Sequence, residues 1–147
     1  MNGLVCVSLG TSSSHVLQAL EKLDPAKEMA EIRVDLLTDY STAIELIFKR
    51  AKALNISTIA TVREIQADPG FSKTRSNLMK QCIDQGCTFV DVEVESPDDY
   101  REDIIKHAKA LGVVVIVSHH NYEAVESSSE NLDAVVEECF TIDADVA

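Results

Sequence analysis

The sequence is poor in basic residues: 13 Lys and Arg stand against 25 Asp and Glu, which gives a formal net charge of −12. Proteins that bind nucleic acid or anionic membrane surfaces neutralise phosphate or headgroup charge with clustered Lys and Arg. The composition therefore argues against both kinds of partner. It favours a small-molecule ligand that a local cluster of cations holds within a negative overall field.

Long apolar runs and a secretion signal are also missing. No stretch approaches the roughly 18 consecutive apolar residues of a membrane-spanning helix. The N-terminus, Met1 to Leu4, lacks a basic region followed by an apolar run. We therefore expect neither membrane insertion nor secretion, and a cytoplasmic location.

Paired cysteine motifs are a third absence. None of the four cysteines forms a CxxC pair or has a histidine at metal-ligand spacing; they are Cys6, Cys82, Cys87 and Cys139. Disulfide frameworks and zinc sites normally show such spacing. We expect reduced, mostly buried thiols and no metal site.

The sequence does contain a regular alternation of short β-branched runs and amphipathic stretches, repeating about every 25 to 30 residues, which is typical of βα units and a parallel sheet. Strands are predicted at Leu4–Ser8, Glu31–Asp35, Thr58–Val62, Thr88–Val92, Val113–Val117 and Ile142–Val146. Helices are predicted at Ser12–Leu23, Ser41–Leu54, Ser76–Gln85, Tyr100–Leu111 and Leu132–Cys139. Gly112, directly after Leu111, predicts a helix end. Without a linker or a composition shift, residues 1–147 form one predicted domain.

Polar residues stand at the C-terminal ends of four predicted strands: Glu31, Arg33 and Asp35; Arg63; Asp91 and Glu93; and Ser118 to Asn121. In a barrel of parallel strands these ends converge on the face where active sites lie. An edge strand with one wet face would also explain the charges of the second strand. The recurrence of Arg63 and Glu93 at matching positions favours a site. Arg63 has two open interpretations, an ion-pair partner of Glu31 or Glu93 and a bidentate clamp for a substrate carboxylate.

Two adjacent histidines follow the fifth predicted strand. Because His119 and His120 differ by one position, one faces the sheet interior and the other turns away. A histidine among carboxylates and arginines suits general acid–base chemistry, although a histidine near a strand end more often makes a structural hydrogen bond. Ser8, before the loop Gly10 to Ser14, has a similar ambiguity, since such a loop can hold an anion or simply cap a helix.

The segments Val5–Ser8, Glu31–Asp35, Thr61–Arg63, Asp91–Glu93 and Val115–Tyr122 together resemble the type I 3-dehydroquinate dehydratase family of the shikimate pathway. The resemblance covers the whole chain. It implies an α/β fold of the (β/α)8 TIM-barrel type, of which this chain holds about the first five to six βα units as a single partial barrel over residues 1–147. The family is a lyase that dehydrates 3-dehydroquinate to 3-dehydroshikimate. It uses an imine between a lysine and the substrate ketone, and a histidine that moves the protons.

Carried over to this chain, the resemblance makes His120 the general acid–base. Glu31 would orient His120 or bond the substrate hydroxyls. Ser8, Arg33 and Arg63 would contact polar groups of the substrate. The implied chemistry needs no metal or organic cofactor.

The resemblance leaves Asp91 and Glu93 as residues that fix the histidine and the arginines without touching the substrate. Relatives are commonly dimers, so a homodimer is expected.

This chain departs from the family pattern in two places. Ala67 stands where relatives carry a glutamate, so proton handling would pass through Glu64, Asp68 or water, or be weakened. The family's imine-forming lysine would follow Ala147, and the lysines present fall on predicted helices or loops. We therefore expect this chain alone to lack the imine step, and its open barrel edges predict association. The alternatives are a non-catalytic carboxylate-binding barrel fragment or pseudoenzyme and, ranked below it, an unrelated phosphate-binding barrel.

Overall fold

The computed structural model describes residues 3–63, 71–120 and 129–147. Within these ranges five strands alternate with five α-helices and one short 3₁₀ turn, η1. Their bounds are β1 Val5–Leu9, α1 Ser13–Leu20, β2 Glu28–Arg33, η1 Val34–Leu36, α2 Tyr40–Ala53, β3 Thr58–Thr61, α3 Phe71–Asp84, β4 Phe89–Glu93, α4 Asp98–Ala110, β5 Val114–Ser118 and α5 Ser129–Thr141. The predicted βα alternation is confirmed.

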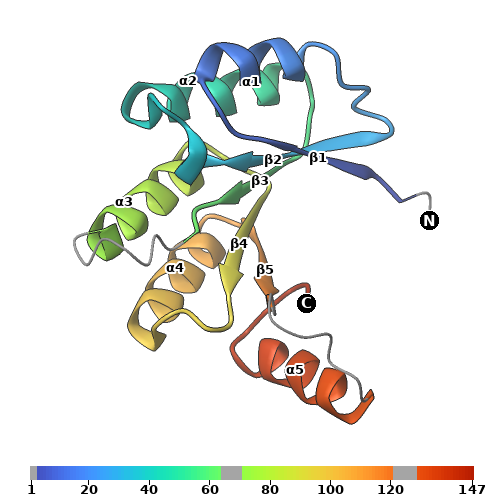
Figure 1. The fold of residues 1–147 in the computed structure, drawn as a ribbon, viewed down its shortest axis with the longest axis vertical. Coiled ribbons are helices and arrows are strands. Elements are labelled where there is room, and N and C mark those ends of the chain that lie inside the picture. The colour runs from blue at the N-terminus through green and yellow to red at the C-terminus, as the bar shows by residue number, and fades with distance from the viewer. Residues whose placement is uncertain (1–2, 64–70, 121–128) are drawn as a thin grey trace.

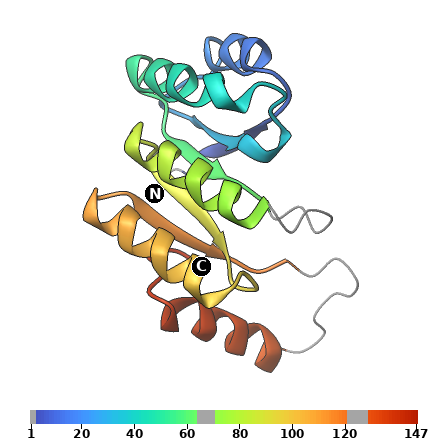
Figure 2. The ribbon, with the colours of Figure 1, turned by 90° about the vertical axis from the view of Figure 1, so that its left-hand side faces the viewer.

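The five strands form one parallel sheet in the order β1-β2-β3-β4-β5. The order never reverses, so each helix returns the chain to the next position along the sheet. Right-handed crossovers then place the connecting helices on the same face. Figures 1 and 2 show α1, α2, α3 and α4 along one side of the sheet. This is the arrangement of a partial (β/α)8 barrel, in which the opposite face of the sheet is the barrel interior.

The hydrophobic core lies between the sheet and these helices. Alternate strand residues are fully buried on the helix side: Ala30, Ile32, Ala60, Val90, Val92, Val115 and Val117. The largest buried helix residues belong to the same cluster: Leu20, Ile47, Phe48, Met79, Ile83 and Ile104. Because strand side chains alternate between faces, the other half of each strand points to the barrel interior. That face carries the polar residues.

Two predicted strands need correction. The second was expected to run to Asp35, but β2 ends at Arg33 and Asp35 lies in η1, where it folds back to pair with Arg33. The sixth was expected over Ile142–Val146, but α5 runs to Thr141 and Val146 forms a single parallel bridge to Ile116. The Asp145 and Val146 amides both donate to the Val115 carbonyl, at 2.9 and 3.1 Å. Beside β5, where a sixth strand is expected, the described residues form this single bridge and no strand.

No helix in the described part of the chain is long and apolar enough to cross a membrane.

Candidate functional site

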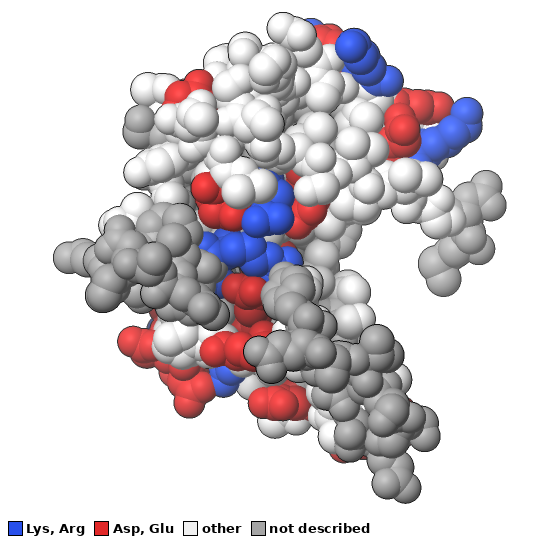
Figure 3. Space-filling view, in the orientation of Figure 1, with Lys and Arg blue, Asp and Glu red and all other residues white. Residues whose placement is uncertain are grey.

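Charged side chains gather at the C-terminal ends of β2 to β5, on the face away from α1 to α4. The register places Arg33 beside Thr61, Thr61 beside Asp91, and Glu93 beside Ser118. Residues paired in register point to the same face. In Figure 3, acidic and basic atoms meet in the hollowed middle of the visible surface, where Figure 1 labels β3 and β4. The strand ends thus converge as the sequence predicted.

Arg63, two residues beyond β3, joins β4 and β5 through its guanidinium. Its Nη2 lies 2.7 Å from Asp91 Oδ2, its Nη1 lies 3.0 Å from Glu93 Oε1, and the same Nη1 is 3.4 Å from the Ser118 hydroxyl oxygen. The arginine side chain is 18% exposed. Arg63 therefore forms the ion pair with Glu93 that was one of its open interpretations, and a second pair with Asp91. Its guanidinium keeps some accessible surface.

Asp91 is the more buried of the two carboxylates that pair with Arg63. Burial raises the pKa of Asp91 above its usual value, and Glu31 acts in the same direction; a hydrogen bond from Ser118 and the charges of Arg63 and His120 oppose the increase. Glu31 and His120 are thus among the charged groups that act on the pKa of Asp91. Among the described residues, Asp91 Oδ1 and the neighbouring Thr61 Oγ1 have no hydrogen-bond partner, although both are buried. The barrel interior at this level therefore offers polar atoms to a ligand or water.

Arg33 and Asp35 form a bidentate ion pair at the end of β2. Arg33 Nε lies 3.1 Å from Asp35 Oδ1, and Nη2 lies 2.7 Å from Oδ2. The Asp35 side chain is 4% exposed and that of Arg33 is 28% exposed. The buried carboxylate thus fixes the orientation of a guanidinium that remains partly accessible.

The loop after β1 is not an open anion site. The Ser13 amide and hydroxyl donate to Asp39 Oδ1 and Oδ2, at 3.0 and 2.5 Å, so a carboxylate from the next βα loop occupies the N-terminus of α1. These bonds hold the pKa of Asp39 below its usual value. The loop does not cap the helix with its own side chains either, because Ser12 at the N-cap position makes no side-chain capping bond. Ser8 lies in register with Glu31 and is exposed on the edge strand.

The two histidines have different surroundings. His119 Nδ1 bonds the carboxylate of Glu95, in the turn between β4 and α4. His120 lies two residues beyond Ser118 and contributes to the electrostatic environment of Asp91. Of the two histidines, His120 is the one whose charge acts on the pKa of Asp91.

Arg75 is a site residue that the sequence analysis missed. It lies on α3, is 2% exposed, and donates a 2.9 Å bond to Glu93 Oε2. The sequence predicts a helix that begins at Ser76 and so leaves Arg75 in a loop, whereas α3 begins at Phe71. A signal was present, because position 75 precedes Leu78 and Met79 by three and four residues and so falls on their buried stripe. A charge on an apolar stripe marks a buried, paired group.

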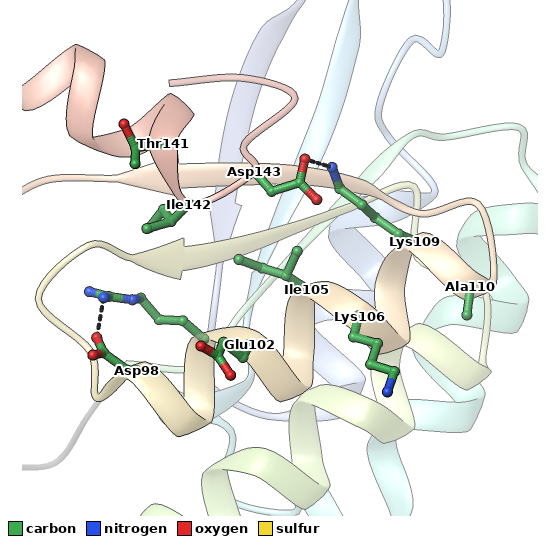
Figure 4. A pocket seen from close by; sticks show the side chains of 10 residues that line it. Asp98, Glu102, Ile105, Lys106, Lys109, Ala110, Thr141, Ile142 and Asp143 are labelled. Atoms are coloured by element: carbon green, nitrogen blue, oxygen red, sulfur yellow. Dashed lines mark hydrogen bonds and ion pairs between the residues drawn. The ribbon is translucent and has the colours of Figure 1, made fainter.

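A separate groove of about 760 Å³ lies between α4 and the end of α5, and none of the strand-end residues lines it. Figure 4 shows Ile105 and Ile142 in this groove, with Lys109 turned toward Asp143, and that ion pair measures 2.6 Å. Two of its charged pairs, Arg101 with Asp98 and Lys109 with Asp143, lie apart and do not form one cluster. We do not assign the reaction to it.

No group of three or more His, Cys, Asp or Glu side chains within the described ranges could hold a metal ion. Cys82, Cys87 and Cys139 are buried and Cys6 is exposed, all as free thiols. Burial raises the pKa of Cys87 to about 12. Glu64, Ala67, Asp68 and Asn121 lie outside the described residues.

Comparison with known proteins supports the resemblance. Residues 5–147 match the model of the type I 3-dehydroquinase family. The 3-dehydroquinate dehydratase of Methanosarcina barkeri is 34% identical over 127 residues, which cover 82% of this chain and 52% of that protein. That of Methanocaldococcus jannaschii is 28% identical over 142 residues, which cover 95% and 62%.

A solved structure shows the same fold. The type I 3-dehydroquinate dehydratase of Clostridium difficile, determined with covalently modified comenic acid, superposes with a TM-score of 0.83 at 19% identity, over 98% of this chain and 60% of that one. This chain thus spans between about half and two thirds of the length of the relatives it matches. The predicted partial TIM barrel is confirmed. The family match over nearly all its residues shows that this chain belongs to the type I 3-dehydroquinase family.

Proposed function

We propose that this chain provides the substrate-binding and proton-transfer half of a 3-dehydroquinate dehydratase site. The observation that carries the proposal is the cluster in the barrel interior, where Arg63 is held by Asp91 and Glu93 and His120 lies near Asp91. These groups occupy the C-terminal strand ends, where barrel enzymes bind substrates. They belong to a chain of the matching family.

In this proposal the arginines bind the substrate and His120 transfers the protons. Arg33 and Arg63, each fixed by carboxylates, receive the carboxylate and hydroxyl oxygens of 3-dehydroquinate, and Ser8 adds a hydroxyl contact. Once the ketone has become an iminium, the neighbouring C–H bond is acidic and His120 takes its proton. The electron pair of that bond forms the enamine, and His120 then returns the proton to the leaving hydroxyl, which departs as water.

Carboxylates keep these groups in place. Glu31 orients His120 or bonds substrate hydroxyls, while Asp91 and Glu93 hold the arginine. The family's imine-forming lysine has no counterpart among residues 1–147, so the proposal assigns no imine step to them. We also propose that residues 1–147 form one domain of a cytoplasmic homodimer. Sedimentation tests the dimer through a mass near twice 16.1 kDa.

Calorimetric titration with 3-dehydroquinate tests the binding role. Wild-type protein should bind one molecule per chain, and Arg63→Met should weaken binding at least tenfold, because it removes a charge-assisted contact. Arg101→Met is the matched control, since Arg101 pairs with Asp98 on α4, outside the site. Tighter binding of glycerol 3-phosphate than of 3-dehydroquinate would contradict the proposal and favour a phosphate-binding barrel.

Borohydride trapping separates binding from turnover. With 3-dehydroquinate and borohydride, the 16.1 kDa chain should retain its mass, because an exposed lysine is too basic to form an imine readily at neutral pH. A stable adduct would contradict the proposal that residues 1–147 form no imine, and would show that one of their lysines reacts.

A further inference from the structure

Arg75 lies at the centre of a bonded network behind the candidate site. Its Nε donates to the Val62 carbonyl at 2.7 Å, Nη1 to the Ser96 hydroxyl at 3.0 Å, and Nη2 to Glu93 Oε2 at 2.9 Å. The guanidinium carbon stands 4.2 Å from the centre of the Tyr100 ring. A buried charge is unfavourable unless it is paired and hydrogen-bonded. All three nitrogens of Arg75 meet this condition, so its orientation is fixed.

Glu93 connects Arg75 to the site. One carboxylate oxygen, Oε2, accepts from Arg75, and the other, Oε1, lies 3.0 Å from Arg63 Nη1. The carboxylate is therefore held between two guanidinium groups. Arg75 is 3% exposed at its side chain and Arg63 is 18% exposed, so the buried arginine is the anchor and the accessible one faces the barrel interior.

We propose that Arg75 is a positioning residue: by fixing Glu93 from behind, it sets the direction in which Arg63 presents its guanidinium to a ligand carboxylate or hydroxyl. The inference rests on the proposed function, to which it adds a residue that determines ligand affinity. Arg75 itself does not touch the ligand.

Charge adds to the effect of geometry. Arg63 and Arg75 together balance Asp91 and Glu93, with which they form three ion pairs. Without Arg75, one guanidinium would face two carboxylates, and the group would carry a net negative charge in a protein whose formal charge is already −12. Such a group would repel an anionic ligand. Loss of Arg75 is therefore expected to weaken binding most at low salt, where screening is least.

Arg101 provides a matched comparison. It also donates from a helix to a carbonyl near a strand end, that of Val94, and it pairs with Asp98. Its side chain is 15% exposed, and its hydrogen bonds and ion pair within the described residues go to Val94 and Asp98. Replacement of Arg101 therefore measures the cost of losing a helix-to-strand anchor without disturbing the site.

The test compares Arg75→Met, Arg75→Lys and Arg101→Met, each confirmed as folded by urea unfolding. In titrations with 3-dehydroquinate, Arg75→Met should raise Kd about tenfold and Arg75→Lys less, because lysine keeps the charge but cannot make the three directed bonds. Arg101→Met should leave Kd within twofold. Unchanged Kd in folded Arg75→Met would overturn the inference.

A double-mutant cycle with Glu93→Gln distinguishes positioning from general stability. If Arg75 acts through Glu93, Arg75→Met should raise Kd much less in the Glu93→Gln background than in wild type. Equal increases in both backgrounds would show that Arg75 acts by another route and would contradict the inference.

The NMR signal of the Arg63 Nη–H protons, whose nitrogens pair with Asp91 and Glu93, gives a readout without ligand. It should be protected from exchange in wild type and should broaden or lose protection in folded Arg75→Met. If the wild type does not bind 3-dehydroquinate at all, the proposed function fails, and this signal still decides whether Arg75 positions Arg63. A signal that is identical in both proteins would refute the positioning role.

Discussion

Gly10 and Arg33 pack so closely that a methyl group on Gly10 would stand 2.7 Å from Arg33 Cβ, and 3.1 Å from the Arg33 carbonyl oxygen. The loop after β1 therefore rests directly on the backbone that presents one of the two site arginines. A side chain at position 10 could fit only by displacing that backbone or the loop.

Gly10→Ala should accordingly lower the free energy of unfolding by about 1–3 kcal/mol, the usual cost of overpacking, and should weaken 3-dehydroquinate binding by moving Arg33. Gly3→Ala is the control, because nothing lies within 4 Å of a Cβ at Gly3. Urea unfolding measures both variants. Equal stability of Gly10→Ala and Gly3→Ala would show that the close approach has no energetic consequence.

Arg63→Met should raise the pKa of Asp91 further above its usual value. Burial already raises that pKa, and the charge of Arg63 is one of the effects that oppose the increase. A carboxyl group whose pKa is higher in the folded state than in the unfolded state destabilises the folded protein as the pH rises. The loss develops between the pKa of the unfolded state and that of the folded state. Arg63→Met should deepen this loss.

The carboxyl ¹³C chemical shift of Asp91, followed during a pH titration, measures this pKa. Arg101→Met should leave it unchanged. A lower pKa of Asp91 in Arg63→Met than in wild type would contradict the ion pair.

Tyr100→Phe should leave stability at neutral pH unchanged or slightly higher. The Tyr100 hydroxyl is buried and, among the described residues, has no hydrogen-bond partner, so its removal exposes no donor or acceptor. The ring remains beneath the Arg75 guanidinium. A loss of more than about 1 kcal/mol, the net worth of a typical hydrogen bond, would reveal a partner for the hydroxyl.

Tyr100→Phe should also differ from wild type in its stability at alkaline pH. Burial raises the pKa of Tyr100 from 10 to about 12, so the unfolded chain loses this proton before the folded chain does. Wild-type stability should therefore fall between pH 10 and 12, by about 2–3 kcal/mol from this group. Tyr100→Phe should show a shallower fall, whereas parallel curves would place Tyr100 in solvent.

His120→Ala and His119→Ala should differ sharply in an active form of the enzyme that includes the imine-forming lysine. The loss of a general acid–base lowers kcat about 10²–10⁴-fold, whereas His119 pairs with Glu95, in the turn after β4, and its loss should change kcat only a few-fold. Steady-state kinetics measure both. Similar losses for the two variants would exclude His120 as the specific base.

Hydrophobic periodicity was sufficient to predict the five strands and the helices between them, because β2 to β5 bury apolar residues at alternate positions and the helices have apolar stripes. The edge strand β1 buries none of its residues, and its β-branched run carried the prediction there. Gly112 has a φ of +71°, directly after α4, as a helix end requires. The convergence of polar strand ends also followed from the pattern, since parallel strands in a barrel share one carboxyl-terminal face.

Contacts between distant segments were not predictable in this way. Asp39 caps α1 from 26 residues away, and Arg75 on α3 reaches Glu93 on β4, 18 residues away. Such pairings depend on tertiary geometry, which local propensity does not contain.

The most direct test of the account is an NMR titration of the ¹⁵N-labelled chain with 3-dehydroquinate. Substrate binding at the strand ends should give saturable shifts in the signals of Arg63, Asp91 and Ser118, and Arg63→Met should abolish them. The absence of saturable shifts, or shifts concentrated at Ile105 and Lys109 in the groove between α4 and α5, would contradict it.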